Sequence, residues 1–266
     1  MFKMQSMRCV VLLMTMILVG SCSTTKKTVD FSQNKVVAHR GAWKAKNLPE
    51  NSIASLKEAI RMQYTGTEFD VRMTANDSLI ITHDPDYANL EIEESSYEDL
   101  SKFPLKNGEI LPTLRQYILT GLENNTKTRL VCEIKPSKDK ERGLIIAEKV
   151  YNMINELKAQ HMVVYISFSY DILKRLEELN PEVHTQYLDG SKSPEILKRD
   201  GIDGADYYLS VFKNHPEWII SAKKNKIALN AWTVNEEEDM EWFLKNDFDF
   251  ITTNEPELLL NKTAQR

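Results

Sequence analysis

The chain has 266 residues, of which 27% are charged, with 34 Lys and Arg against 39 Asp and Glu. This length accommodates one barrel-sized domain or two small ones, and no linker rich in Pro, Gly and Ser divides the interior. The acidic balance excludes proteins that bind nucleic acid through a basic surface, and it excludes membrane attachment through a basic face.

Residues 1–21 have the order of charge, apolar run and small residues that is typical of a signal peptide, and the run is too short for a permanent membrane span. Val19-Gly20-Ser21-Cys22 resembles a bacterial lipobox, which implies cleavage before Cys22, a lipid on its thiol and a polar tether over residues 22–34. We therefore expect an exported protein, anchored by lipid to a bacterial membrane on its periplasmic or cell-surface side. An ordinary signal peptide with an incidental cysteine is the alternative, and the oligomeric state stays open.

The cysteines provide no disulfide framework. Cys9 lies in the predicted signal peptide, and Cys22 is expected to carry the lipid. Cys132 is then left without a partner, so we predict that it is a small core residue.

Short runs of β-branched and aromatic residues recur along the chain and predict strands. Most of them alternate with stretches whose apolar residues recur at three- and four-residue spacing, which predicts helices and a parallel sheet. The predicted strands are 35–38, 67–71, 79–82, 129–134, 162–168, 183–188, 205–210, 227–234 and 248–252. The predicted helices include 52–62, 143–159, 170–178, 217–225 and 236–244.

Nine strands are one too many for an eight-stranded barrel. Only seven residues separate Val71 from Leu79, too few for a crossover helix, so the run at Leu79 must return antiparallel as a hairpin. The hairpin brings His83 back near the C-terminal end of the preceding strand. Residues 35–266 are thus predicted to form an α/β fold, a (β/α)₈ TIM barrel, with its active site at the C-terminal ends of the strands. Residues 84–112 interrupt the alternation and are predicted to form a small inserted lobe above that face.

Carboxylates alternate along two of the predicted strands. Glu68 and Asp70 share one side of their strand while Phe69 points the other way, and Glu133 alternates in the same way with Lys135. Inward carboxylates from neighbouring strands repel each other unless a cation lies between them. Hard oxygen ligands favour Ca²⁺ or Mg²⁺, and no zinc-like spacing of Cys and His competes. A salt-bridged polar layer of the barrel is the alternative.

His39, Arg40 and Gly41 end the first strand. Arg can contact two phosphate oxygens at once, and Lys135 could contact one. His can transfer a proton near neutral pH. His83 would supply a second proton-transfer group, while Asp84 either orients that imidazole or begins a turn before Pro85.

Three further residues are assigned by position. Glu50 precedes the first helix and is predicted to bind metal or a substrate hydroxyl, and Asn51 is predicted to be the N-cap of that helix. Trp232 ends the seventh parallel strand and is predicted to present an apolar wall at the barrel mouth, with core packing as the alternative. The remaining histidines lack charged motifs around them and are expected to be structural: His161, His184 and His215.

With these residues assembled, the chain resembles the glycerophosphodiester phosphodiesterase family. Seven elements match in the family's order, which is far more specific than any one of them. They are His39-Arg40-Gly41, Pro49-Glu50-Asn51-Ser52, Glu68-Phe69-Asp70-Val71, His83-Asp84, Glu133-Ile134-Lys135, Trp232-Thr233-Val234-Asn235 and Ile251-Thr252-Thr253-Asn254-Glu255-Pro256.

The resemblance implies a divalent cation, Ca²⁺ or Mg²⁺, at Glu68, Asp70 and Glu133. It also implies that His39 and His83 are the acid and base, without saying which is which.

It further implies that Arg40 and Lys135 contact the phosphate and that Glu50 lies near metal or glycerol. In that family the substrate's glycerol hydroxyl is thought to attack phosphorus, giving a cyclic phosphate that water then opens. The expected products are glycerol 3-phosphate and an alcohol.

The chain departs from the family pattern in two places. The usual Arg-Thr stretch after the His-Asp pair is replaced by residues 85–90, and the usual Thr-Asp near the end is Thr253-Asn254. Neither change removes a proposed catalytic group, so the first one bears on the alcohol headgroup and not on the reaction.

Two other functions compete with this hypothesis. One is a phospholipase-like phosphodiesterase acting on lipid headgroups, which would need an apolar rim for acyl chains. The other is a non-catalytic surface lipoprotein that binds ligands in a decayed site. Every acid, base and phosphate position holds a chemically competent residue, which argues against decay.

Overall fold

The computed structural model describes residues 29–265. The predicted signal peptide, Cys22 and most of the predicted tether lie outside the described residues. No helix within residues 29–265 is long and apolar enough to cross a membrane.

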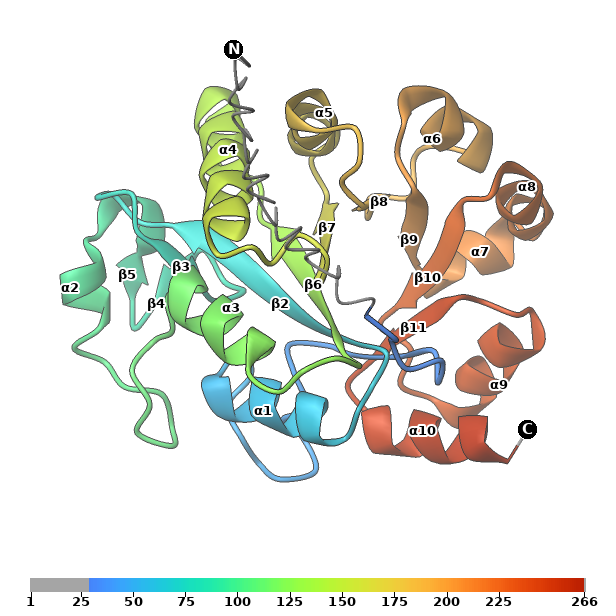
Figure 1. Ribbon diagram of the computed structural model, residues 1–266, viewed down its shortest axis with the longest axis horizontal. Coiled ribbons are helices and arrows are strands. Elements are labelled where there is room, and N and C mark those ends of the chain that lie inside the picture. Colours follow the sequence, from blue (N-terminus) through green and yellow to red (C-terminus); the bar gives the residue numbers. More distant parts are fainter. Residues whose placement is uncertain (1–28, 266) are drawn as a thin grey trace, which may run out of the picture.

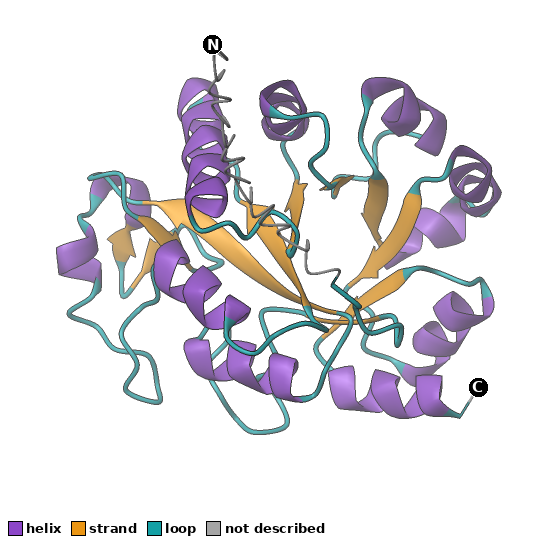
Figure 2. Ribbon diagram, viewed as in Figure 1, coloured by secondary structure: helices purple, strands orange, loops and turns teal. Residues whose placement is uncertain are grey.

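Eight parallel strands close into a barrel, with helices around them (Figures 1 and 2). Closure comes from the first strand, in which Val37 pairs with Gly66 on one side and with Thr252 on the other. The predicted TIM barrel is therefore confirmed. Its strands are β1 (Val36–Ala38), β2 (Gly66–Met73), β6 (Arg129–Ile134), β7 (Val163–Ser167), β8 (Thr185–Tyr187), β9 (Gly204–Tyr208), β10 (Ala228–Trp232) and β11 (Phe250–Thr253).

The helices pack their apolar faces on the outside of the barrel, where buried side chains of strands and helices form two large clusters. The five predicted helices are present, with small shifts at their ends. The remaining helices were not predicted, because their apolar patterns are short or only weakly periodic. The helices outside the insertion are α1 (Ile53–Arg61), α3 (Leu114–Leu122), α4 (Lys140–Glu156), α5 (Tyr170–Leu179), α6 (Pro194–Asp200), α7 (Leu209–Asn214), α8 (Glu217–Asn225), α9 (Glu237–Lys245) and α10 (Pro256–Ala264). Cys132 is a free, buried core residue, as predicted.

The predicted hairpin is present as β3 (Leu79–Ile81), which pairs antiparallel with β2. Thr82 donates its backbone N–H to the Asp70 carbonyl oxygen over 3.0 Å. His83 therefore lies beside β2 at about the level of Asp70, near the end of the strand, as the hairpin predicts.

Residues 84–112 stand to one side of the barrel, at the left of Figure 1. They contain β4 (Asp86–Tyr87), β5 (Leu90–Glu91), a 3₁₀ turn (Ile92–Glu94) and α2 (Tyr97–Leu100). They have a small apolar core of their own around Ile92, Leu100 and Leu111, shared with Ile80 of β3.

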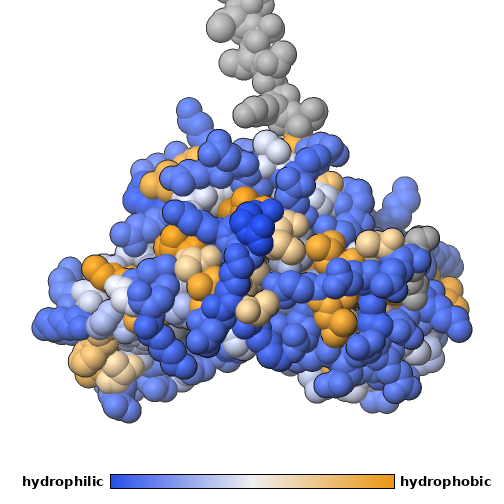
Figure 3. Space-filling model, turned by 90° about the horizontal axis from the view of Figure 1, so that it is seen from below, coloured by the Kyte–Doolittle hydropathy of each residue, from blue (hydrophilic) through white to orange (hydrophobic). Residues whose placement is uncertain are grey.

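The face of the molecule seen from below is mostly hydrophilic, with apolar side chains in separate small groups (Figure 3). This agrees with the acidic, highly charged composition of the chain.

Helix α1 begins one residue later than predicted. Ser52 is its N-cap, because its side chain accepts a hydrogen bond from the Ser55 backbone N–H. The prediction that Asn51 caps this helix is wrong: Asn51 has a φ of 54° and turns its side chain toward the barrel interior instead.

An ion-pair cluster fixes α1 to the loop that precedes it. Hydrogen bonds from Arg61 and Lys46 lower the pKa of Glu58 to about 2, although burial opposes them. Since the folded pKa lies below the unfolded value of 4.5, this stabilisation is complete above pH 4.5 and is lost as the pH falls toward 2. We expect Glu58→Gln to lower the free energy of unfolding by about 1–2 kcal/mol at pH 7 and by clearly less at pH 3, measured by urea denaturation. An equal loss at both pH values would contradict this account.

Candidate active site

A cavity of about 140 Å³ opens at the C-terminal ends of the barrel strands. Seven of the predicted site residues line it, together with six residues to which the sequence assigned no role. The predicted ones are His39, Arg40, Glu68, His83, Glu133, Lys135 and Trp232; the others are Ile166, Phe168, Leu188, Asp206, Thr233 and Thr252. Asp70 lies beneath the cavity and is fully buried.

Three carboxylates meet on the inner wall of the barrel. Glu68 and Asp70 project from the same face of β2, while Phe69 packs outward against Tyr117 with 4.5 Å between ring centroids. Asp70 pairs in register with Glu133 of β6, so the parallel pairing of the two strands places the Glu133 carboxylate beside that of Asp70. One oxygen from each of the three lies within 4.8 Å of the others.

These carboxylates are 0–6% exposed, and Glu68 Oε1 has no hydrogen-bond partner. Burial, then the charges of Asp70 and Glu133, raises the pKa of Glu68 well above its usual value. Burial also raises the pKa of Glu133, again with Asp70 as the second cause. Such mutual repulsion is relieved by a cation, and three hard oxygen donors fit Ca²⁺ or Mg²⁺. The residues present therefore fit a divalent cation.

Lys135 supplies the positive charge already present in this cluster. Its ammonium lies 2.9 Å from Asp70 Oδ1 and 2.8 Å from Glu133 Oε1. Burial opposes ionisation of Asp70, but Lys135, His83 and a hydrogen bond from Asn51 outweigh it and lower the pKa of this carboxyl. Asp70 is thus the ionised anchor of the cluster, and Glu68 is its least satisfied member.

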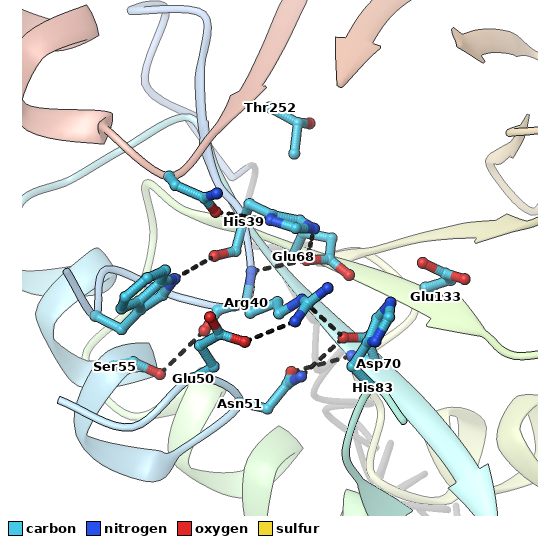
Figure 4. Close-up of polar contacts among 12 residues, drawn as sticks. His39, Arg40, Glu50, Asn51, Ser55, Glu68, Asp70, His83, Glu133 and Thr252 are labelled. Atoms are coloured by element: carbon cyan, nitrogen blue, oxygen red, sulfur yellow. Dashed lines mark hydrogen bonds and ion pairs between the residues drawn. The ribbon is translucent and has the colours of Figure 1, made fainter. Parts of the chain in front are cut away.

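The turn after β1 holds Arg40 at the edge of the cavity. Gly41 has a φ of 85°, and a Cβ at this position would lie 2.4 Å from Ser55 Oγ, so only glycine fits. Arg40 donates its backbone N–H to Glu68 Oε2 over 2.7 Å and its guanidinium Nη1 to Glu50 Oε2 over 2.6 Å. Glu50 therefore contacts Arg40 and is not one of the three clustered carboxylates (Figure 4).

His39 is the more enclosed of the two active-site histidines. Its Nδ1 lies 2.8 Å from the amide oxygen of Asn254, and its Nε2 lies 3.9 Å from Glu68 Oε2. Because an amide oxygen only accepts hydrogen bonds, Nδ1 carries the proton and Nε2 keeps its lone pair. Burial lowers the pKa of His39 to about 4.

The sequence marks Asn254 only as a departure from the family pattern and does not reveal its contact with His39. It follows β11, whose Thr253 pairs with Ala38 at the end of β1. Asn235 holds it by accepting its backbone N–H over 2.9 Å.

His83 sits on the more open side of the cavity. Its Nδ1 lies 2.8 Å from Asp84 Oδ1, and the two side chains are 38% and 73% exposed. The hydrogen bond from His83 is the main cause of the lowered pKa of Asp84. Figure 4 shows the Arg40 guanidinium and the Glu68 carboxylate between the two imidazoles. The other histidines do not line this cavity; His184, for example, pairs with Asp203 on the surface.

Two aromatic side chains, Phe168 and Trp232, line the same cavity. Trp232 contacts Phe168 and Tyr208 edge to face, with centroid distances of 5.4 and 5.3 Å. Phe168 is 37% and Tyr208 47% exposed, so they form a rim and not a core. Trp232 therefore belongs to a group of three rings, because Phe168, directly after β7, and Tyr208, at the end of β9, each contribute one.

Asn51 is a second residue whose position in the site the sequence did not reveal. Its amide donates to Asp70 Oδ2 over 2.8 Å, and its amide oxygen accepts the Asp70 backbone N–H over 3.2 Å. It thereby fixes the orientation of a carboxylate that faces the candidate cation.

We expect Asn51→Gly to weaken Ca²⁺ or Mg²⁺ binding by about 10–100-fold, because it removes an orienting contact to a ligand. Glycine tolerates the φ of 54°, so the backbone is preserved. Asn47→Gly is the matched control, since Asn47 has a φ of 51° in the same loop and is exposed. Isothermal titration calorimetry would measure the affinities, and equal values for both variants would refute the orienting role.

Comparison with known proteins agrees with this geometry. Residues 39–258 match the sequence model of the glycerophosphoryl diester phosphodiesterase family. The chain belongs to this family. The prediction of a phosphodiesterase of this family, and therefore of an enzyme, is confirmed.

A curated glycerophosphodiester phosphodiesterase from Caldanaerobacter subterraneus is 30% identical over 242 residues, covering 85% of this chain and 96% of that protein. A crystal structure of a glycerophosphodiester phosphodiesterase from Parabacteroides distasonis is 36% identical, with a TM-score of 0.85, and covers 89% of this chain and 99% of that one. An Oleispira antarctica phosphodiesterase, solved with the product sn-glycerol-3-phosphate, shares the fold at 21% identity and a TM-score of 0.70, covering 87% of this chain and 97% of that one.

Proposed function

We propose that the protein hydrolyses glycerophosphodiesters to glycerol 3-phosphate and an alcohol, and that it depends on a divalent cation at Glu68, Asp70 and Glu133. The observation that carries this proposal is the grouping of two imidazoles, two cationic side chains and three buried carboxylates around one cavity. A bound cation would supply positive charge that polarises the phosphodiester and balances charge in the transition state.

The different partners of the two histidines support separate roles. We propose that His39 is the base, because its Nε2 is unprotonated and its partner Asn254 carries no charge that would favour imidazolium. We propose that His83 is the acid, because Asp84 holds its Nδ1 at 2.8 Å and the exposed side of the imidazole gives the departing alcohol a way out.

In the first step, the glycerol C2 hydroxyl would attack phosphorus and give its proton to His39 Nε2. The P–O bond to the alcohol breaks, and His83 protonates the departing oxygen, which leaves a cyclic glycerol phosphate. In the second step, neutral His83 takes a proton from water as it attacks phosphorus, and His39 returns its proton to the C2 oxygen as the ring opens. Arg40 and Lys135 would bind the phosphate oxygens throughout.

The test is release of glycerol 3-phosphate by the purified protein from a panel of glycerophosphodiesters, with Ca²⁺, Mg²⁺ or EDTA. Release that EDTA stops and one of the two metals restores would support the proposal and identify the metal. No release across the panel by a folded, metal-supplied protein would overturn it in favour of a binding role.

One observation favours the phospholipase-like alternative: Phe168, which lines the cavity, and Tyr208, which packs on Trp232, expose apolar surface. Lysophosphatidylcholine therefore belongs in the panel. Faster turnover of this lipid than of glycerophosphocholine would make lipid headgroups the substrates.

We also propose that Cys22 carries a lipid that anchors the protein to a bacterial membrane on the exported side. The support is the Val19-Gly20-Ser21-Cys22 sequence behind an apolar run and ahead of a polar stretch. Cells expressing the full chain should incorporate labelled palmitate into it, and Cys22→Ser should abolish both labelling and recovery in the membrane fraction. Label retained by Cys22→Ser would refute the anchor.

A further inference from the structure

Asp206 lies in the active-site cavity, although no motif pointed to it. On β9 the side chain of Tyr207 packs outward against Phe212 and Tyr187, so the alternation of the strand turns Asp206 into the barrel. Asp206 is 1% exposed and lines the cavity that contains the catalytic residues.

One oxygen of this buried carboxyl is left without a partner. The Asn230 side chain of β10 lies near Asp206 and opposes the rise of its pKa, and the Asn230 amide oxygen accepts a hydrogen bond from Thr252 over 3.2 Å. Asp206 Oδ1 has no hydrogen-bond partner. Leaving a buried polar atom unsatisfied costs stability, and in an enzyme cavity it marks a position where a ligand completes the bonding.

The surroundings of Asp206 favour a neutral hydroxyl over phosphate as that ligand group. The cations proposed to bind the phosphate are Arg40 and Lys135, whereas the neighbouring ionisable group that influences Asp206 is the Glu133 carboxylate. An ionised carboxylate beside another one repels an anion, whereas a neutral hydroxyl can bond to Asp206 in either protonation state because it both donates and accepts.

The substrate offers one hydroxyl of this kind. In the proposed reaction the C2 hydroxyl attacks phosphorus, so the C1 hydroxyl of glycerol is free to bind. We propose that Asp206 binds this C1 hydroxyl and thereby selects glycerol esters whose C1 position carries no acyl chain. This inference rests on the proposed function and deepens it, because it names the group by which the site distinguishes glycerophosphodiesters from lysophospholipids.

Burial, with Glu133 as the second cause, raises the pKa of Asp206 well above its usual value. A protonated carboxyl has an O–H to donate to the hydroxyl, while the ionised form would accept from it, so the contact exists in either state.

Two substrates that differ by one oxygen test the proposal. Glyceryl p-nitrophenyl phosphate carries the C1 hydroxymethyl group, and 2-hydroxypropyl p-nitrophenyl phosphate carries a methyl group in its place. Both have the attacking hydroxyl and the same leaving group. We expect the wild-type protein to prefer the glyceryl ester by about 10–100-fold in kcat/KM, the range for a buried hydrogen bond left unpaired.

Asp206→Leu should reduce this preference to within about 3-fold, mainly by slowing turnover of the glyceryl ester. Asp206→Asn keeps the shape and one acceptor oxygen, so it should show an intermediate preference and serves if the leucine variant does not fold. Gln186→Leu is the matched control, because Gln186 is a buried, inward-facing polar residue of the neighbouring strand that does not line this cavity. This control should retain the wild-type preference.

The possible outcomes distinguish failure of the proposed function from failure of the role proposed for Asp206. A wild-type protein that cleaves neither ester contradicts the proposed function itself. A wild-type protein that cleaves both, with a preference that Asp206→Leu and Asp206→Asn leave unchanged, overturns the role of Asp206 alone. Loss of the preference in Gln186→Leu as well would assign the effect to general disturbance of the barrel interior and would also overturn it.

Discussion

Glu68→Gln is expected to abolish metal-dependent turnover while leaving a folded protein. A catalytic cation contributes several kcal/mol to lowering the barrier, so kcat/KM for glycerol 3-phosphate release should fall by at least about 10³-fold. Because Glu68 is buried beside Asp70 and Glu133, removing its charge relieves repulsion in the metal-free protein. Its metal-free Tm should therefore equal or exceed the wild-type value.

Thermal unfolding with and without Ca²⁺ or Mg²⁺ gives the second readout. The wild-type Tm should rise with the active metal, since a ligand at 100 times its Kd stabilises the native state by about 2.7 kcal/mol, and the Tm of Glu68→Gln should not. Asp70→Ala should lose activity equally but also stability, because Lys135 then keeps only one of its two carboxylate partners. Glu94→Gln, at an exposed carboxylate of the inserted segment, is the matched control. Wild-type turnover in Glu68→Gln or Asp70→Ala would refute the metal assignment.

His39→Ala and His83→Ala should each lower kcat by about 10²–10⁴-fold on glycerophosphocholine, the range for loss of a general acid or base. Their responses to the leaving group should differ. p-Nitrophenolate departs without protonation, so a variant lacking only the acid recovers most of its activity on glyceryl p-nitrophenyl phosphate. We expect this recovery for His83→Ala and not for His39→Ala.

The reverse pattern would exchange the two roles and contradict the argument from Asn254 and Asp84. Recovery in neither variant would show that leaving-group protonation is not the task of either histidine. His184→Ala is the control, since His184 lies on the surface paired with Asp203 and should retain full activity on both esters.

The sequence pattern predicts most of the carboxylate site. Glu68 and Asp70 must share a face because strand side chains alternate, and the same holds for Glu133 and Lys135. The short spacing between Val71 and Leu79 required a hairpin, which is present and carries His83 into the site. These inferences depend only on local covalent geometry and on counting strands, so they needed no coordinates.

Only the closed barrel determined which residues contact the candidate catalytic groups. His39 and Asn254 are 215 positions apart and meet because β1 pairs with β11. Asn is a common N-cap residue, and Asn51 lies just before α1. Ser52 caps the helix instead, so the Asn51 amide is free to bond to Asp70. Asp206 stands in a run with no charged motif, and its significance comes from what it lacks, a partner for one buried oxygen. Local patterns determine which way a side chain points, whereas its neighbours across the barrel depend on long-range pairing and packing that no short stretch of sequence encodes.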